Sequence, residues 1–184
     1  MLNSKYIRQK IDKYQIIEKF EMESHIGIGV GKYIEKELFL AKKSMLIISP
    51  GISLKIGEKI FEHIKNGIET KILTGSGGGS DSLETNKLAM EIMKKNKDRT
   101  AYQNLSLEYR IIDKEKNKLI HPKIYIIDDS CAIIGSANLT YNGFNNFVEY
   151  IQIFRDNEHI KIIKNDFEKL WDLLEKNQIY YSFQ

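Results

Sequence analysis

Four side chains that could together act on a phosphorus atom lie close to one another in the sequence. His121 and Lys123 are two residues apart, and Ser136 and Asn138 follow a little further along, directly after Gly135. A neutral imidazole is a competent nucleophile toward phosphorus, and a covalent intermediate divides one difficult displacement into two easier ones. The ammonium, hydroxyl and amide groups could stabilise charge on the non-bridging oxygens. These residue types indicate displacement at a phosphoryl group without a metal ion.

Two acidic residues accompany this group, and we expect different roles for them. Asp128 lies an odd number of positions after Lys123. In a strand it would face the opposite side, and we expect it to anchor backbone or turn groups. Glu149 lies in the apolar run 147–151, where a carboxylate needs a partner. One good candidate is the second ring nitrogen of His121, because that contact would fix the tautomer of the nucleophile.

The spacing of these residues resembles the signature of the phospholipase D superfamily, in particular its short branch with one copy of the motif, which includes bacterial nucleases. The matching positions are His121, Lys123, Asp128, Gly135, Ser136 and Asn138, with Glu149 where that family often has an acidic residue. The resemblance implies that His121 forms a phosphohistidine, that Lys123 and Asn138 hold the phosphate, and that no metal ion or cofactor takes part. The candidate catalytic residues are therefore His121, Lys123, Asn138, Ser136 and Glu149, and the structural members of the motif are Asp128 and Gly135.

Apolar periodicity along the chain predicts an α/β fold. Strand patterns cover residues 44–49, 70–74, 105–112, 119–128, 132–135 and 148–154. Helical patterns cover residues 33–41, 55–65 and a C-terminal segment that begins at Asp156. This order predicts a single domain with a mixed β-sheet flanked by α-helices on both faces, which is compatible with a phospholipase D-like fold. His121 and Lys123 would share one face of the strand 119–128.

The remaining segments allow weaker predictions. Residues 1–30 carry apolar side chains at helical spacing, so we expect a helical N-terminal extension before a catalytic domain over residues 31–184. The glycine-rich segment 27–32 lacks the spacing of a nucleotide-binding fingerprint, and we interpret it as a flexible approach to the first helix. A second glycine-rich segment, 75–80, is predicted to be a flexible loop. Residues 141–145 could form a wall of the substrate site or pack inside the protein.

The motif occurs once in usable form, and this affects how the reaction could be completed. In-line displacement needs a nucleophile on one side and an acid for the leaving oxygen on the other. His63 and His159 each precede a lysine by two positions, but both lie in predicted helices and neither is followed by Gly-Ser-x-Asn. We therefore expect a twofold symmetric homodimer that brings His121 and its counterpart into one shared site.

The composition is that of an ordinary soluble globular protein and excludes few functions. The chain has 42% hydrophobic and 29% charged residues, and its net charge of +3 permits a polyanionic partner without requiring one. No segment has the length of a membrane span, and the N-terminus lacks the apolar core of a signal peptide. We therefore expect a cytoplasmic protein with no membrane partner.

Three functions are compatible with these patterns. The leading hypothesis is a metal-independent nuclease acting on nucleic acid, in particular DNA. Lysine clusters at residues 94–99 and 114–118 could follow a phosphate backbone, or could simply be solvated surface. The first alternative is a phospholipase or phosphatidyltransferase, which would need an acyl channel or an amphipathic surface helix. The second is a non-catalytic DNA-binding module of a larger system, and the intact set of polar motif residues argues against it.

Overall fold

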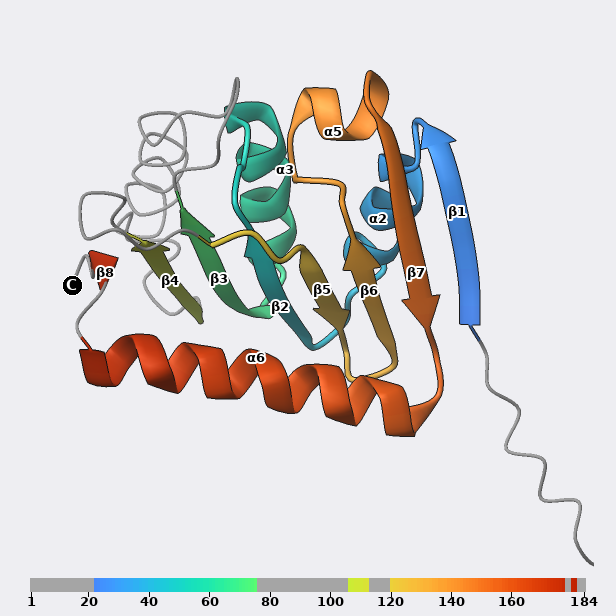
Figure 1. The fold of residues 1–184 in the computed structure, drawn as a ribbon. Coiled ribbons are helices and arrows are strands. Elements are labelled where there is room, and N and C mark those ends of the chain that lie inside the picture. Colours follow the sequence, from blue (N-terminus) through green and yellow to red (C-terminus); the bar gives the residue numbers. More distant parts are fainter. Residues whose placement is uncertain (1–21, 76–105, 113–119, 178–179, 182–184) are drawn as a thin grey trace, which may run out of the picture.

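A single mixed β-sheet forms the centre of the computed structural model, which describes residues 22–75, 106–112, 120–177 and 180–181 (Figure 1). The sheet has eight strands in the order β1-β7-β6-β5-β2-β3-β4-β8. The strands are β1 (Met22–Ile28), β2 (Ser44–Ser49), β3 (Glu69–Gly75), β4 (Leu107–Ile112), β5 (Ile124–Ile127), β6 (Cys131–Gly135), β7 (Val148–Phe154) and β8 (Tyr180–Tyr181). The helices are α2 (Gly31–Leu38), α3 (Leu54–Ile64), α5 (Tyr141–Asn145) and α6 (Asn157–Asn177).

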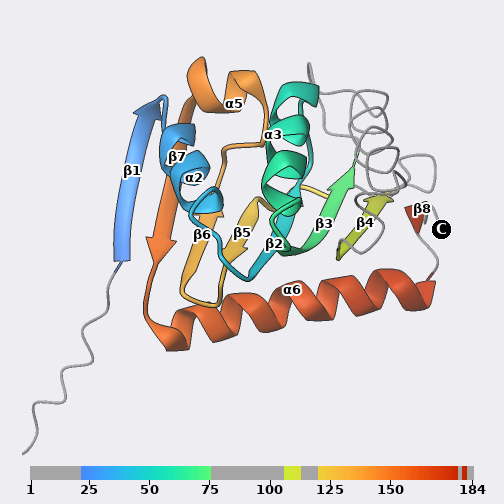
Figure 2. The same ribbon diagram turned by 180° about the vertical axis from the view of Figure 1, so that it is seen from behind.

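Helices cover both faces of the sheet, as the sequence predicts. Helices α2 and α3 lie on one face and α6 crosses the other, which is clear when the two views are compared (Figures 1 and 2). Successive strand residues point to opposite faces. Ile47 therefore packs in the core with α2 and α3, whereas Ile48 packs in the core with α6. Continuous burial of β2 on both faces explains why its sequence is an uninterrupted apolar run.

The strand directions bring several chain segments to one end of the sheet. Strands β2, β5, β6, β7 and β1 are neighbours and each is antiparallel to the next. Consequently β2, β6 and β1 end at the same edge at which β5 and β7 begin. This edge is drawn uppermost in Figure 1, and we call it the upper end of the sheet. Residues just before β5 and just after β6 must therefore lie near one another.

Strand β5 is shorter than the predicted strand 119–128. It begins at Ile124, so His121 and Lys123 lie in the connection that leads into it. Pro122 has no backbone N–H and cannot donate to a strand ladder, which explains the late start. The other predicted strands and helices in the described residues are confirmed with small shifts at their ends. The predicted start of the last helix is also confirmed, because Asp156 Oδ1 accepts a hydrogen bond from the His159 N–H at 2.9 Å.

The N-terminal prediction is wrong for residues 22–28. These residues form β1, which pairs with β7 along its whole length, instead of continuing a helix. Inter-strand hydrogen bonds to β7 outweigh the helical spacing of apolar residues upstream. Residues 1–21 lie outside the described residues, and so do the loop from residue 76 to 80 and both lysine clusters. Within the described residues, no helix is long and apolar enough to cross a membrane.

Candidate active site

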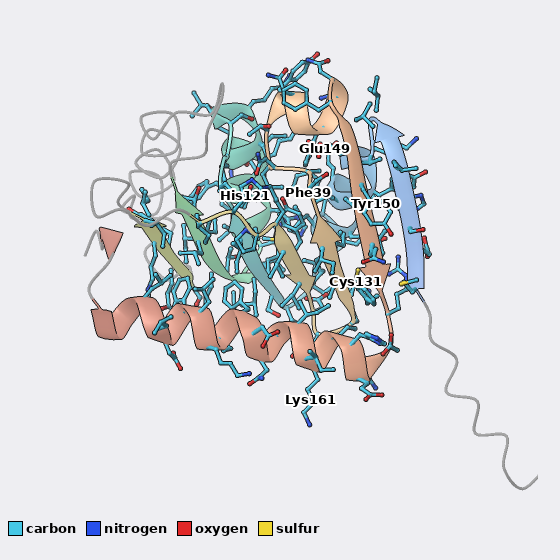
Figure 3. All side chains as sticks on the ribbon, in the orientation of Figure 1. Phe39, His121, Cys131, Glu149, Tyr150 and Lys161 are labelled. Carbon is cyan, nitrogen blue, oxygen red and sulfur yellow. The ribbon has the colours of Figure 1, made fainter. Side chains whose placement is uncertain are left out.

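His121 and Lys123 lie together at the upper end of the sheet. The Lys123 ammonium is 2.7 Å from the His121 carbonyl oxygen, 3.3 Å from Nε2 of the ring and 3.4 Å from Nδ1. The hydrogen bond to the carbonyl holds the lysine, and the nearly equal distances place its charge alongside the imidazole. His121 itself is exposed, and its position is labelled in Figure 3. The two side chains therefore meet as expected, although they lie before β5 and not within it.

Lys123 is a buried cation. Only 5% of its surface is exposed. Burial lowers its pKa below the usual lysine value, and the negative charge of Glu149 opposes part of that shift. A desolvated ammonium next to an exposed imidazole interacts strongly with any anion that reaches the histidine, because little water screens it. This arrangement suits the binding of a phosphate group.

Asp128 binds backbone groups at the opposite end of β5. Its carboxylate accepts hydrogen bonds from the N–H groups of Lys42, Lys43 and Ser44 at 2.7, 2.7 and 2.8 Å. Burial raises the pKa of this carboxyl, but the three backbone donors and the charge of Lys43 outweigh burial and leave the pKa below its usual value. Asp128 also has a positive φ of 53° in the turn between β5 and β6. It thus joins that turn to the start of β2, in line with the expectation from its position.

Gly135 allows two chain segments to approach closely where β6 ends. A Cβ atom at this position would collide with the Tyr150 carbonyl oxygen and would lie 2.9 Å from the Ile151 Cα. The next residue uses this proximity, since the Ser136 N–H donates to the Tyr150 carbonyl at 2.9 Å. In return the Tyr150 N–H donates to the Ser136 hydroxyl at 3.0 Å. The glycine is needed here for space, and it fixes the serine against β7.

Glu149 binds Ser136 and not the predicted partner. The Ser136 hydroxyl donates a hydrogen bond to Glu149 Oε2, while the predicted contact with the second ring nitrogen of His121 is not among the hydrogen bonds of the described residues. The strand order explains this correction. Glu149 is on β7 and His121 leads into β5, so β6 lies between them. Ser136, which directly follows β6, is therefore nearer to the Glu149 carboxylate than His121 is. Two strand spacings correspond to about 10 Å.

The loop that carries Asn138 is fastened to the turn after β2. The buried Ser49 hydroxyl accepts a hydrogen bond from the Leu139 N–H at 3.0 Å, and the Leu139 carbonyl accepts one from the Ser53 N–H at 3.0 Å. From β5, the buried Tyr125 hydroxyl donates to the Ala137 carbonyl at 2.7 Å. Sequence reasoning missed Ser49 and Tyr125, because both act through contacts distant in sequence.

Asn138 is half-buried, and its Oδ1 is a buried acceptor with no hydrogen-bond partner in the described residues. Native proteins rarely leave a buried polar atom unpaired, and such atoms occur at functional sites. The supported backbone of this loop and the unpaired Oδ1 indicate a side chain positioned for a role other than stabilising the fold.

The other histidines have structural partners away from this group. His63 Nε2 is 3.0 Å from the Ala41 carbonyl, and the imidazole of His159 lies 2.7 Å from Asp156 Oδ1 at the start of α6. Lys161, the companion of His159 in the sequence, extends from α6 away from the sheet (Figure 3). His25 stacks on the Tyr33 ring with a centroid separation of 3.7 Å. His121 is thus the one histidine placed beside Lys123.

The sequence of this chain matches a protein-family model described as "Cardiolipin synthase, PLD-like domain" over residues 34–171. The match spans both the motif residues and most of the sheet. The chain therefore belongs to the phospholipase D superfamily, whose members are phosphodiesterases.

Similar proteins include a bacterial phospholipase D family member and two enzymes named for lipids. Mitochondrial cardiolipin hydrolase of Canis lupus familiaris is 33% identical over 64 residues, which is 35% of this chain and 24% of that protein, so the chain spans about a quarter of its length. The phospholipase D family member Nuc of Salmonella typhimurium superposes with a TM-score of 0.63 at 15% identity, over 89% of this chain and 99% of Nuc. Phosphatidylserine synthase of Haemophilus influenzae gives a TM-score of 0.64 at 14% identity, over 100% of this chain and 48% of the synthase. These two structures establish the shared fold.

Proposed function

We propose that this protein is a metal-independent nuclease that hydrolyses nucleic-acid phosphodiester bonds through a phosphohistidine on His121. The observation that carries the proposal is the placement of the buried Lys123 ammonium beside the exposed His121 ring. A nucleophile and a desolvated cation at one surface point supply both the attacking group and the charge stabilisation that phosphoryl transfer needs.

The proposed reaction has two displacements. A nitrogen of His121 attacks phosphorus, the bond to the leaving oxygen breaks, and an acid gives that oxygen a proton. The conjugate base of that acid then takes a proton from water as the water attacks the phosphohistidine, which releases the phosphate monoester and restores the imidazole. Lys123 and Asn138 contact the non-bridging oxygens in both steps, and the Ser136–Glu149 pair fixes the wall of the site next to them.

One copy of the chain provides one histidine at this site, so we also propose a homodimer. The acid that protonates the leaving oxygen is then His121 of a second copy, placed across a twofold axis. The other three histidines of the sequence lie on β1, α3 and α6 with the neighbours described above, and this supports an acid from outside the chain.

Nucleic acid is the substrate we favour over phospholipid. The similarity to Nuc extends over nearly the whole of both chains, whereas the similarity to the phosphatidylserine synthase covers about half of that enzyme. The names of the synthase and of the cardiolipin hydrolase keep a lipid phosphodiester as the second candidate. The third candidate, a DNA-binding module without catalysis, is weakened by the geometry of His121 and Lys123.

One cleavage experiment separates these candidates. Wild-type protein is incubated in excess EDTA with single-stranded and double-stranded DNA and, in parallel, with vesicles that contain cardiolipin. The nuclease proposal expects DNA cleavage that His121→Ala abolishes and that the matched variant His159→Ala keeps. Release of lipid products with intact DNA would favour the lipid enzyme, and DNA binding without cleavage would favour the binding module.

The dimer proposal is tested by the dependence of activity on protein concentration. Specific activity should fall as the protein is diluted below the dissociation constant of the dimer, in step with the loss of dimer in analytical ultracentrifugation. A monomer that retains full specific activity at nanomolar concentration would contradict a shared site.

A further inference from the structure

A hollow with a volume of about 320 Å³ lies beside the outermost strand, where β1 turns into α2. We call it the β1–α2 hollow. Residues that line it include His25, Ile26, Ile28, Gly29, Lys32 and Tyr33. This is the glycine-rich segment that the sequence analysis interpreted as a flexible approach to the first helix. In the structure it is an ordered turn against a concave surface.

The hollow opens at the same end of the sheet as His121. Gly27 on β1 is paired with Glu149 on β7, so the turn that follows β1 stands at the level of the acidic residue of the site. The loop after Asn138 leads into α5, and the Phe144 ring of α5 lies against Gly31 where a Cβ would otherwise stand. Helix α5 and the turn between β1 and α2 therefore pack against each other at the upper end of the sheet, where the candidate active site also lies (Figure 1).

The backbone of the turn is shaped so that it leaves this surface open. Gly29 has a φ of +80°, a conformation that other residues rarely adopt, and a Cβ there would meet no atom within 4 Å. Gly27, with a φ of +135°, likewise faces open space. A ligand can thus approach the main chain of the turn more closely than side chains at these positions would allow.

The hollow combines one cation with a lining that is mostly polar. Lys32 is exposed, lies 5.0 Å from the centre of the Tyr33 ring, and forms no salt bridge with a carboxylate of the described residues. Glu23 on β1 is already engaged, since its carboxylate is 3.6 Å from His25 Nε2 and 3.5 Å from Arg155 Nε. Ile26 and Ile28 also line the hollow and are 76% and 65% exposed, but they contribute little apolar surface to it.

We propose that the β1–α2 hollow is a second binding subsite, which holds a nucleotide of the nucleic-acid strand away from the bond that is cleaved. Lys32 contacts the phosphate of that nucleotide, and the polar lining and open main chain of the turn bind its sugar and base. A volume of 320 Å³ is within the range of small-ligand sites, so it accommodates a nucleotide and not only a phosphate. The proposal rests on the nuclease function proposed above and adds where the substrate continues.

The position of the subsite predicts a minimum substrate length. Strand β1 is three strands from β5, which corresponds to about 14 Å. For a strand that keeps the rise of about 3.4 Å per nucleotide found in a duplex, the subsite should contact the substrate about four nucleotides from the scissile bond, and an extended single strand would reach it in fewer. Substrates shorter than this should not benefit from Lys32.

The test compares a fluorescently labelled 20-nucleotide DNA strand with the small diester bis(p-nitrophenyl) phosphate. The variants are Lys32→Gln, Lys32→Arg and the matched control Lys161→Gln, which removes a charge from α6. Lys32→Gln should lower the ratio of kcat/KM for the strand to kcat/KM for the small diester roughly three- to tenfold. It should also reduce the slope of log KM for the strand against log salt by about 0.7, the value expected for one lost phosphate contact. Lys32→Arg should restore the slope, and Lys161→Gln should change neither quantity.

The outcomes separate the two proposals. If wild-type protein cleaves the strand but Lys32→Gln behaves like Lys161→Gln, the subsite is refuted and the nuclease stands. If wild-type protein leaves the strand intact, the nuclease function fails and the subsite falls with it. Direct binding of the strand to His121→Ala protein, with and without Lys32→Gln, gives a second measurement that does not depend on turnover. Equal melting temperatures of the variants confirm that folding is not the cause of any difference.

Discussion

The Lys123 ammonium is bound by the carbonyl oxygen of His121, the residue that it must assist. The distance is 2.7 Å, and the same nitrogen lies 3.3 Å from Nε2 of the His121 ring. The charge and the proposed nucleophile are therefore positioned by one short piece of backbone. A change that moves one of them also moves the other, so the pair should respond to mutation as a unit.

The first prediction concerns the pH dependence that Lys123 imposes. Burial lowers its pKa, so the ammonium loses its proton at a lower pH than an ordinary lysine would. Phosphate binding needs the charged form, and the alkaline limb of kcat/KM should therefore lie below about pH 10.4, the usual lysine value. Lys123→Ala should be inactive. In Lys123→Arg the residual activity should lose this limb, because a guanidinium stays charged. A limb that persists unchanged in the arginine variant would assign it to another group.

The second prediction concerns the stability that Asp128 provides. Its pKa is lowered in the folded protein, so its contribution is present above the unfolded pKa of about 3.9 and is lost as the pH falls through the lower folded value. Asp128→Asn should lower the free energy of unfolding by about 2 kcal/mol at pH 7, because the charge that accepts three N–H groups is removed. Urea unfolding at pH 7 and at about pH 3 should show the difference shrinking in acid. Folded Asp128→Asn protein should keep its activity, and a stable but inactive variant would contradict a structural role.

The third prediction concerns the Ser136–Glu149 hydrogen bond. Ser136→Ala and Glu149→Gln should each lower kcat/KM roughly tenfold or more. The double variant should have a kcat/KM close to that of the less active single variant, because the two residues act through one contact. Ser130→Ala is a suitable control, since that hydroxyl donates to the Ile127 carbonyl in the β5–β6 turn, at the far end of the sheet. Losses that simply add in the double variant would mean that the residues act separately.

The fourth prediction concerns the close approach at Gly135. Gly135→Ala forces a Cβ against the backbone of Tyr150 and Ile151, and should lower the free energy of unfolding by about 2–3 kcal/mol. Activity should fall as well, because Ser136 is displaced from β7. Gly67→Ala offers a contrast: Gly67 has a φ of +86° and open space around it, so alanine there should cost about 1 kcal/mol without loss of kcat. Thermal unfolding together with kinetics measures both effects.

The sequence predicts the parts of this protein that depend on local pattern. Strand β2 and the helix that begins at Asp156 follow from apolar periodicity and a capping side chain, and the spacing of His121, Lys123 and Ser136 indicated the site. The partner of Glu149 was not predictable in this way, because it depends on which strand separates β7 from β5. The hydrogen bonds by which Ser49 and Tyr125 hold the loop of Asn138 could not be predicted for the same reason. They depend on the strand order β6-β5-β2, which is not the order of the chain.

The hydrogen bond between Asp128 and the Lys43 N–H joins residues 85 positions apart. Because β2 lies between β5 and β3, the centre of the sheet closes only when the chain up to the β5–β6 hairpin is available. During synthesis, one edge of β2 therefore stays unpaired until some eighty further residues have emerged from the ribosome, which takes about 4–16 s at typical rates of elongation. An apolar strand with a free edge promotes aggregation, so the yield of folded protein from a recombinant host should depend on how well the free edge of β2 is protected in that interval.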